Sequence, residues 1–541
     1  MKMRGTALAL WLLLLLAAEY VLLVPLNLTS VPFWGMFLVF GTLLLMIPAI
    51  PGGRGAGDIP GGKAGTEKVI GFGQIRKSGR GSGKGVPYRS ARWISTAFLF
   101  GVGGMLLLGL ALLFCSPVFH AGNYASAIGE IETTTFEEAR PQVDSVSDIA
   151  LIDTATASRI GSRKLGSLED VVSQFVDGEY TQITYKGRVK KTAAVDYDGL
   201  FKYMNNRGTG TPGYLIVDPI AGTAELVRTQ NGIRYTPGAY FSQDISRHLR
   251  KQYPTLLFGE TYFEIDEDGN PWWITQIRRH RLFLLNPENI GVILTDAITG
   301  QSQRYALPEV PEWVDTVFDG DYVCEKFDNY GMLSGGFWNS VFGKKGCRIS
   351  TKCEFEDEDG ESYSVSDFGY VADEKDIWIY TGVTSATSAD HSDIGMLMVN
   401  GRTGRVRYMT LAGADESSAM AAADGELQQY GYLASFPSII NVDGAPAYIM
   451  VMTDNNRIVK NYAMVNMQNY SQVVTGDTQN EVFRKYRRLV SGTELSGRDG
   501  AQEQVISDRK VRSAVFGSDP DGHYLELTFE DGTSEKFYME N

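Results

Sequence analysis

Three long apolar runs open the chain. Residues 7–24, 33–50 and 93–115 are almost entirely hydrophobic, and Glu19 is the only charged residue in them. Each run approaches the about 20 residues that a helix needs to cross about 30 Å of hydrocarbon. A single strand cannot replace such a helix, because an open sheet edge leaves backbone groups unpaired in lipid. The pattern therefore predicts three membrane-spanning helices.

The first run also begins like a signal peptide, with Lys2 and Arg4 before a Leu-rich middle. Leu16-Ala17-Ala18 is a poor cleavage site, and the apolar run continues through residues 21–24. We therefore interpret the first run as an uncleaved anchor.

Basic residues predict the orientation. The segment 51–92 carries nine Lys/Arg and two acidic residues, whereas the segment 25–32 carries no charge. Positive segments stay on the cytoplasmic side. We expect the N-terminus and 51–92 in the cytoplasm, and everything after about residue 116 outside it. The 13 glycines of 51–92 are typical of a flexible linker, whose lysines and arginines would attract anionic lipid headgroups.

Glu19 allows two interpretations. A carboxylate inside the hydrocarbon is costly, so Glu19 could mark a proton-transfer or helix-pairing site. The simpler interpretation places Glu19 close enough to the outer surface to reach water, and we favour it.

Beyond a polar neck, from about Leu165, the periodicity changes to short apolar runs separated by turn residues. This pattern is typical of antiparallel β structure. Asp-Gly or a close equivalent predicts hairpins in 263–274, 439–450 and 524–539. We predict a fold of three α-helical membrane spans followed by a β-rich α+β body of hairpin-containing modules.

One turn pattern recurs three times, at Asp218–Gly222, Asp296–Gly300 and Asn400–Gly404. Asp or Asn starts such a turn through its side chain, and Gly adopts the positive φ that closes it. The repeats are unequally spaced, so the chain is not a solenoid of fixed period. Helices are predicted between the hairpins, at 240–252, at 416–430 with Ser417 or Ser418 as cap, and at 479–490.

These patterns predict the following organisation: two spans in 1–50, a basic loop in 51–92, a third span in 93–115, a polar neck in 116–164, α+β regions in 165–320 and 321–480, and a C-terminal helix and β-hairpin module in 481–541.

Several stretches also suggest a family. The segments 202–219, 234–254, 263–274, 310–321, 381–404 and 417–442 resemble a family of large membrane-anchored extracytoplasmic proteins of Gram-positive bacteria. Its members have no established activity; automated labels such as colicin V production or Tat-signal protein attach to some and imply little. The resemblance implies the topology and the compartment, and no catalytic residues. The hairpin at 292–305 is also similar to those of PepSY modules, small α+β units outside the membrane that are sometimes linked to protease inhibition.

Charge separates the two ends of the chain. Residues 1–120 carry a net charge of +8 while the whole chain carries −14, so the remainder carries about −22. An acidic body would repel phosphate, which argues against nucleic acid binding.

Motifs of catalysis are missing from the sequence. The five histidines form no zinc spacing, there is no Gly-x-Ser-x-Gly motif, and no cofactor is predicted. His391 between Asp390 and Asp393 is interpreted as a solvated loop residue.

Cysteines and acidic turns offer two weaker sites. A disulfide between Cys347 and Cys353 fits a hairpin, and Cys324 with either of them is also allowed. The two acidic turns, at 266–269 and 357–360, lack the closing Glu of a calcium loop and are interpreted as β-turns. The six carboxylates of 354–361 leave loose cation binding at Asp357 and Asp359 open.

The leading functional hypothesis is a non-enzymatic binding, scaffolding or assembly protein at the outer face of a bacterial cell membrane. Its expected partners are the lipid bilayer and an envelope protein or a second copy of the chain. A PepSY-like regulator or inhibitor of an envelope protease is the first alternative. An enzyme whose site is assembled from scattered residues is the second.

Overall fold

The computed structural model describes residues 2–50, 88–147, 149–356, 362–366, 368–373, 376–387, 392–490, 511–519, 522–529 and 534–538. The chain forms two compact units, Met1–Arg487 and Arg488–Asn541. The second unit contains one antiparallel sheet of β25 (Val511–Asp519), β26 (Gly522–Phe529) and β27 (Ser534–Tyr538).

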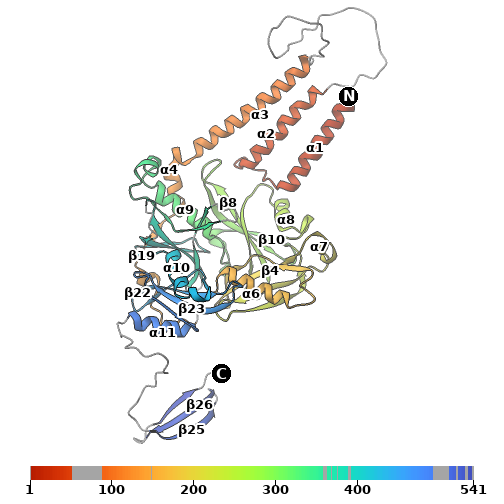
Figure 1. Ribbon diagram of the computed structural model, residues 1–541. Coiled ribbons are helices and arrows are strands. Elements are labelled where there is room, and N and C mark those ends of the chain that lie inside the picture. Colours follow the sequence, from red (N-terminus) through yellow and green to blue (C-terminus); the bar gives the residue numbers. More distant parts are fainter. Residues whose placement is uncertain are drawn as a thin grey trace, which may run out of the picture. The chain divides into compact units, whose positions relative to one another are not determined.

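Three apolar helices begin the first unit, as Figure 1 shows: α1 (Lys2–Leu22), α2 (Val31–Met46, continued by η1, Ile47–Ala49) and α3 (Tyr88–Cys115). Each contains at least 19 residues of high hydropathy, enough to cross a membrane. Many of their apolar side chains are exposed: Leu99 is 73% exposed and Val21 66%. The three predicted apolar helices are confirmed, with boundaries that differ by a few residues.

Two sheets and one helix build the first half of the body. These strands are antiparallel and share one core with α8 (Ile245–Gln252), in which Ile245, Tyr214 and Phe263 are almost fully buried. The first sheet has the order β2 (Phe175–Asp177), β4 (Arg188–Tyr197), β5 (Thr211–Asp218), β6 (Thr223–Ile233), with β3 (Thr181–Tyr185) on β4. The second has the order β10 (Ser302–Ala306), β9 (Pro287–Asp296), β8 (Pro271–His280), β7 (Leu257–Ile265).

The second half repeats this plan with two further sheets around α10 (Glu416–Glu426). The third sheet has the order β1 (Ile131–Thr133), β18 (Val406–Met409), β17 (Gly395–Asn400), β15 (Asp376–Ser385), β11 (Arg348–Ser350), with β14 (Gly369–Asp373) on β15. The fourth has the order β20 (Leu433–Ala434), β22 (Ala445–Thr453), β23 (Val459–Asn466), β24 (Val473–Gly476), with β21 (Ser438–Val442) on β22.

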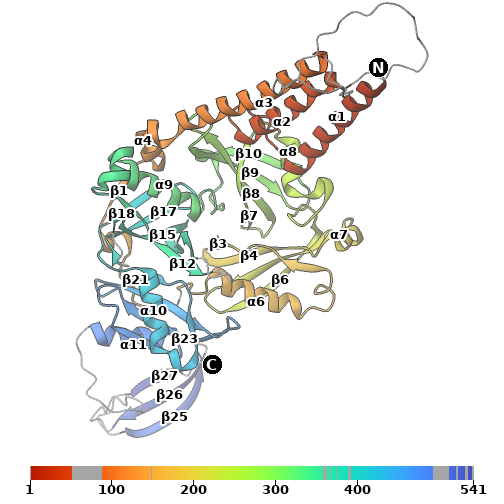
Figure 2. The same cartoon turned by 45° about the horizontal axis from the view of Figure 1, so that its top comes forward.

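The remaining elements connect these layers (Figure 2). They are two-stranded pairs, short helices and turns: β12 (Lys352–Glu356) with β13 (Ser362–Ser366), β16 (Ser392–Asp393) with β19 (Gly413–Ala414), α4 (Pro117–Ala125), η2 (Ser126–Ile128), α5 (Phe136–Ala139), α6 (Thr154–Gly166), α7 (Leu200–Asn206), η3 (Phe241–Gln243), η4 (Leu307–Glu309), α9 (Gly320–Leu333), η5 (Asn339–Gly343), η6 (Gln428–Tyr430) and α11 (Gln479–Val490). Three apolar helices and a mixed α/β body with several antiparallel sheets thus confirm the predicted fold class.

The recurrent turn has the predicted geometry at all three positions. Asp218 Oδ1 accepts hydrogen bonds from the backbone N–H groups two and three residues later, and Asp296 Oδ1 and Asn400 Oδ1 do the same. Gly222 and Gly300 close their turns at φ of +67° and +75°. The three predicted hairpins are also present, as β7–β8, β21–β22 and β26–β27.

Two helices differ from the sequence expectation. The segment 240–252 is α-helical only from Ile245, because Asp244 caps α8 through the Arg247 N–H, and a 3-10 turn, η3, precedes it. Asp415, rather than Ser417 or Ser418, caps α10 by accepting from the Ser418 N–H at 2.8 Å. The third helix, α11, spans the predicted residues.

The polar neck packs into the body more than its composition suggested. Strand β1 pairs in parallel with β18, and Phe136 and Ala139 are 5% and 2% exposed in the core around α10. Ile131 of the neck pairs with Val406, 275 residues later, and no local periodicity can reveal such a pairing.

Candidate functional site

A cavity of about 440 Å³ lies where the two halves of the body meet. Its walls come from β3, β4 and β7 of the first half, from β14 and β15 of the second, and from the segments 150–155, 315–318 and 436–438. Cavities of this size are typical of small-molecule sites.

Lys191 lines the cavity and is 2% exposed. Its ammonium group donates one hydrogen bond, to Thr154 Oγ1 at 3.1 Å. Within the described part of the chain, no carboxylate oxygen lies within 4.0 Å of Lys191 Nζ. The carboxylate whose charge affects Lys191 is that of Asp153. Asp153 Oδ1 instead caps α6 by accepting from the Thr156 N–H. Burial lowers the pKa of Lys191 to about 8, and Asp153 opposes this shift. The cavity therefore presents an amine that lacks a paired counter-ion.

Two buried carboxyl groups lie at the same junction. Glu264 is fully buried and accepts from the Asp315 and Thr316 N–H groups at 2.9 and 2.8 Å. Burial raises the pKa of Glu264 to about 7. Asp315 is 3% exposed and lines the cavity. Burial, together with the nearby charge of Glu264, raises the pKa of Asp315 well above its usual range.

Asp315 also has one oxygen unsatisfied. Its Oδ2 accepts from the Thr184 N–H at 2.5 Å, whereas its Oδ1 has no hydrogen-bond partner among the described residues. The rest of the wall is rich in rings, contributed by Tyr262, Phe318, Phe368, Tyr370, Tyr380 and Phe436. The cavity can therefore contact an anionic group at Lys191, a polar group at Asp315 and an apolar body at the rings.

The body also contacts the apolar helices at two places, the loop between α1 and α2 and the chain that follows α3. In the loop between α1 and α2, Arg250 Nε donates to the Leu23 oxygen at 2.9 Å, and the Leu26 N–H donates to the Pro254 oxygen at 2.8 Å. His280 Nδ1 donates to the Thr29 oxygen at 2.8 Å.

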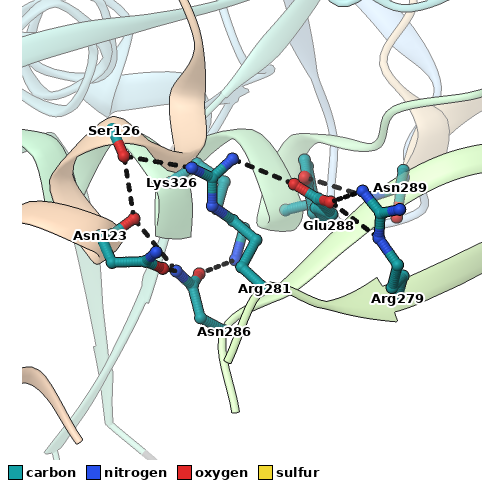
Figure 3. Close-up of polar contacts among 9 residues, drawn as sticks. Asn123, Ser126, Arg279, Arg281, Asn286, Glu288, Asn289 and Lys326 are labelled. Atoms are coloured by element: carbon teal, nitrogen blue, oxygen red, sulfur yellow. Dashed lines mark hydrogen bonds and ion pairs between the residues drawn. The ribbon is translucent and has the colours of Figure 1, made fainter. Parts of the chain in front are cut away.

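The second attachment holds α4, which follows α3 after Ser116 (Figure 3). Asn286 Nδ2 donates to Asn123 Oδ1 at 2.9 Å, and Arg281 Nη2 donates to Ser126 Oγ at 3.2 Å. Lys326 of α9, with a side chain 1% exposed, donates to Asn286 Oδ1 at 3.5 Å. These contacts hold the body against the three apolar helices at two separate points.

The sequence-predicted site residues that the structure describes, Glu19 and Cys347, do not line the cavity. Glu19 lies in the last turn of α1, where its charge acts on Arg250. Cys347 is buried, and its thiol donates to the Met332 oxygen at 3.7 Å. The side chain of Cys353, and Asp357, Asp359 and His391, lie outside the described residues, so the disulfide and the loose cation site stay predictions. The described residues contain no group of three metal-ligating side chains.

Sequence reasoning missed Lys191, Glu264 and Asp315. Lys190-Lys191 resembles an exposed strand end. Alternation along β4 does not single out Lys191, because every residue from Lys191 to Tyr197 is buried, on both faces of the strand.

No family model and no curated protein matches the chain. Among solved structures, an ancestral GH74 enzyme matches at 8% identity and a TM-score of 0.15, over 68% of this chain and 42% of that one. The chain thus spans less than half of that enzyme. An endo-arabinase from Bacteroides thetaiotaomicron (11% identity, TM-score 0.15, 56% of this chain and 74% of that one) and the polysaccharide lyase Uly1 (9%, 0.14, 68% and 77%) match at similar levels. Scores this low carry no argument about fold or function.

Proposed function

We propose that this protein is a membrane-anchored extracytoplasmic binding protein of the bacterial envelope, whose central cavity takes a small ligand with an anionic group. The observation that carries the proposal is the burial of Lys191 in the cavity wall without a paired carboxylate. A buried ammonium group costs free energy unless a charge and hydrogen bonds compensate it. A carboxylate or phosphate of a ligand supplies both.

The remaining walls narrow the class of ligand. The rings of Phe318, Phe368 and Phe436 suit an apolar or cyclic body, and Asp315 Oδ1 suits a polar group that forms a hydrogen bond. The proposed ligand is therefore a small amphipathic molecule, with one acidic end and one apolar end.

Charge placement supports the compartment. The basic segment 51–92 favours the cytoplasmic side, which puts the body and its cavity outside. The resemblance to membrane-anchored extracytoplasmic proteins of Gram-positive bacteria agrees with this orientation.

Thermal unfolding of the full-length protein in nanodiscs, with a panel of small acids, tests the proposal. The panel holds aromatic and aliphatic carboxylates and phosphates, each beside its neutral amide or ester. We expect some acids, and not their neutral partners, to raise the unfolding temperature. Lys191→Met should abolish the shift, while Lys186→Met, an exposed lysine of the same β3–β4 hairpin, should keep it.

The proposal fails if no acid shifts the unfolding temperature, or if Lys191→Met responds like the unaltered protein. Capture of one envelope protein by in-cell crosslinking, together with such a failure, would favour the scaffolding interpretation.

A further inference from the structure

An exposed aromatic segment follows α9. Trp338, Val341 and Phe342 are 65%, 46% and 78% exposed. The rings of Trp338 and Phe342 stack on each other, with centroids 5.8 Å apart and planes 10° apart, so both lie on the same side of the segment. Lys344 and Lys345 follow after Gly343 and are exposed. Large apolar side chains gathered on a surface mark an interaction site.

The segment lies close to the place where α3 ends. Phe337 packs into a cluster with Ala121 and Tyr124 of α4. Ala121 comes six residues after Cys115, the last residue of α3, and the extended residue Ser116 separates α3 from α4. The headgroup layer extends about 5–8 Å beyond the hydrocarbon on each side. Because α4 begins two residues after the end of α3, α4 and the segment packed on it lie beside that layer. Figure 1 and Figure 2 both place α9 beside α4, at the end of the body that α3 enters.

Further exposed rings connect the apolar surface of α3 with the surface of the body. Phe119 of α4 is 60% exposed and stacks on Phe114 in the last turn of α3, with centroids 6.1 Å apart. Phe283, in the β8–β9 connection, is 53% exposed and follows Leu282 of the same α4 cluster. The apolar surface of α3 thus extends onto the body instead of stopping at Cys115.

We propose that the segment 337–345 is a membrane-surface anchor, which lies in the interface of the leaflet on the body's side. Trp338 and Phe342 lie at the boundary between headgroups and acyl chains, where aromatic rings accumulate. Lys344 and Lys345 face anionic headgroups. The occupant is lipid rather than protein, because α3 and α4 already set the segment at the depth of the headgroups. The inference rests on membrane insertion of the three helices and not on the ligand proposed for the cavity.

Site-specific photocrosslinking tests this anchor. The photoreactive residue benzoylphenylalanine replaces Phe342 in one protein and Tyr470, a 57% exposed residue between β23 and β24, in a control. Both are reconstituted in nanodiscs that contain phosphatidylcholine and phosphatidylglycerol. We expect lipid adducts at position 342 and at most traces at position 470. No lipid adduct at 342, equal adducts at both positions, or crosslinks from 342 to a second protein chain would overturn the proposal.

Charge reversal at the two lysines tests their contribution to lipid contact separately from that of the rings. Lys344→Glu with Lys345→Glu should lower the adduct yield at 342 several-fold in the same nanodiscs, and much less in phosphatidylcholine alone. An unchanged yield in both lipids would remove the lysines from the proposed anchor.

Discussion

Arg250 Nε donates a 2.9 Å hydrogen bond to the Leu23 oxygen, which joins α8 of the body to the first residue after α1. Leu23 has a positive φ of 50°, so its backbone holds an uncommon conformation at this contact. Arg250 Nη1 also donates to the Leu256 oxygen at 2.7 Å. One guanidinium group therefore ties together the loop after α1 and the segment after α8.

Replacing Arg250 by Ala should loosen this attachment. Hydrogen bonds from a charged donor each contribute about 1.5–3 kcal/mol, so we expect the free energy of unfolding to fall by about 2 kcal/mol or more. Hydrogen–deuterium exchange should become faster at the Leu26 amide, which bonds to Pro254. Lys251→Ala, an exposed residue of the same helix, is the control and should leave exchange unchanged. Equal exchange in both variants would contradict the role of Arg250.

Lys191→Met should stabilise the ligand-free protein at neutral pH. The fall in the pKa of Lys191 from 10.5 to about 8 corresponds to a cost of about 3 kcal/mol for the buried charge. Methionine fills a similar volume without the charge, so part of this cost is recovered. Chemical unfolding of both proteins measures the gain, and Lys186→Met should change stability by less than about 0.5 kcal/mol. A less stable Lys191→Met protein would show that interactions within the protein compensate the cost of burying the ammonium group.

Lys191 should also make stability rise with pH. Below pH 8 the amine is protonated in both the folded and the unfolded chain, and its cost is constant. Between about pH 8 and 10.5 the unfolded chain binds more protons at this site, so its contribution to stability increases. The difference in unfolding temperature between the unaltered protein and Lys191→Met should therefore shrink over this window. A difference that stays constant would argue against a depressed pKa.

Glu264 should make stability fall, rather than rise, as the pH increases, and it should do so at acidic to neutral pH. Its pKa is raised from 4.5 to about 7, so between these values the folded chain binds more protons than the unfolded chain. The stability that this group contributes is present below pH 4.5 and is lost as the pH rises through 7. Following the Glu264 carboxyl band by infrared spectroscopy with isotope-labelled glutamate should show a group that titrates near pH 7. Titration of all glutamates below pH 5 would contradict this assignment.

Two glycines of the recurrent turn should respond differently to alanine. At Gly300 a Cβ would lie 2.4 Å from the Tyr235 ring, whereas at Gly222 the nearest atom would be Ile152 Cδ1 at 3.5 Å. Both need positive φ, so Gly222→Ala should cost about 1 kcal/mol from backbone strain alone. Gly300→Ala should cost about 1–3 kcal/mol more, since the ring must move. Chemical unfolding compares the two, and equal losses would show that Tyr235 moves away freely.

Features that depend on neighbouring residues were predictable from the sequence. Hydropathy alone predicted the three spans, because a helix in lipid needs only a continuous apolar run and its own hydrogen bonds. The turns at Asp218, Asp296 and Asn400 were equally predictable, since a side chain that caps the N–H two residues later acts within the turn.

The cavity and both attachments of the body to the helices arise only in the folded chain. Lys191 and Thr154 are 37 residues apart, Glu264 and Asp315 are 51 apart, and Arg250 lies 227 residues from Leu23. A lysine is exposed or buried according to what the fold places around it, and a single sequence holds no local trace of that surrounding. The sequence determined the spans, hairpins and turns, while tertiary packing decided which charges lie buried and where the body meets the helices, because burial is a property of distant segments brought together.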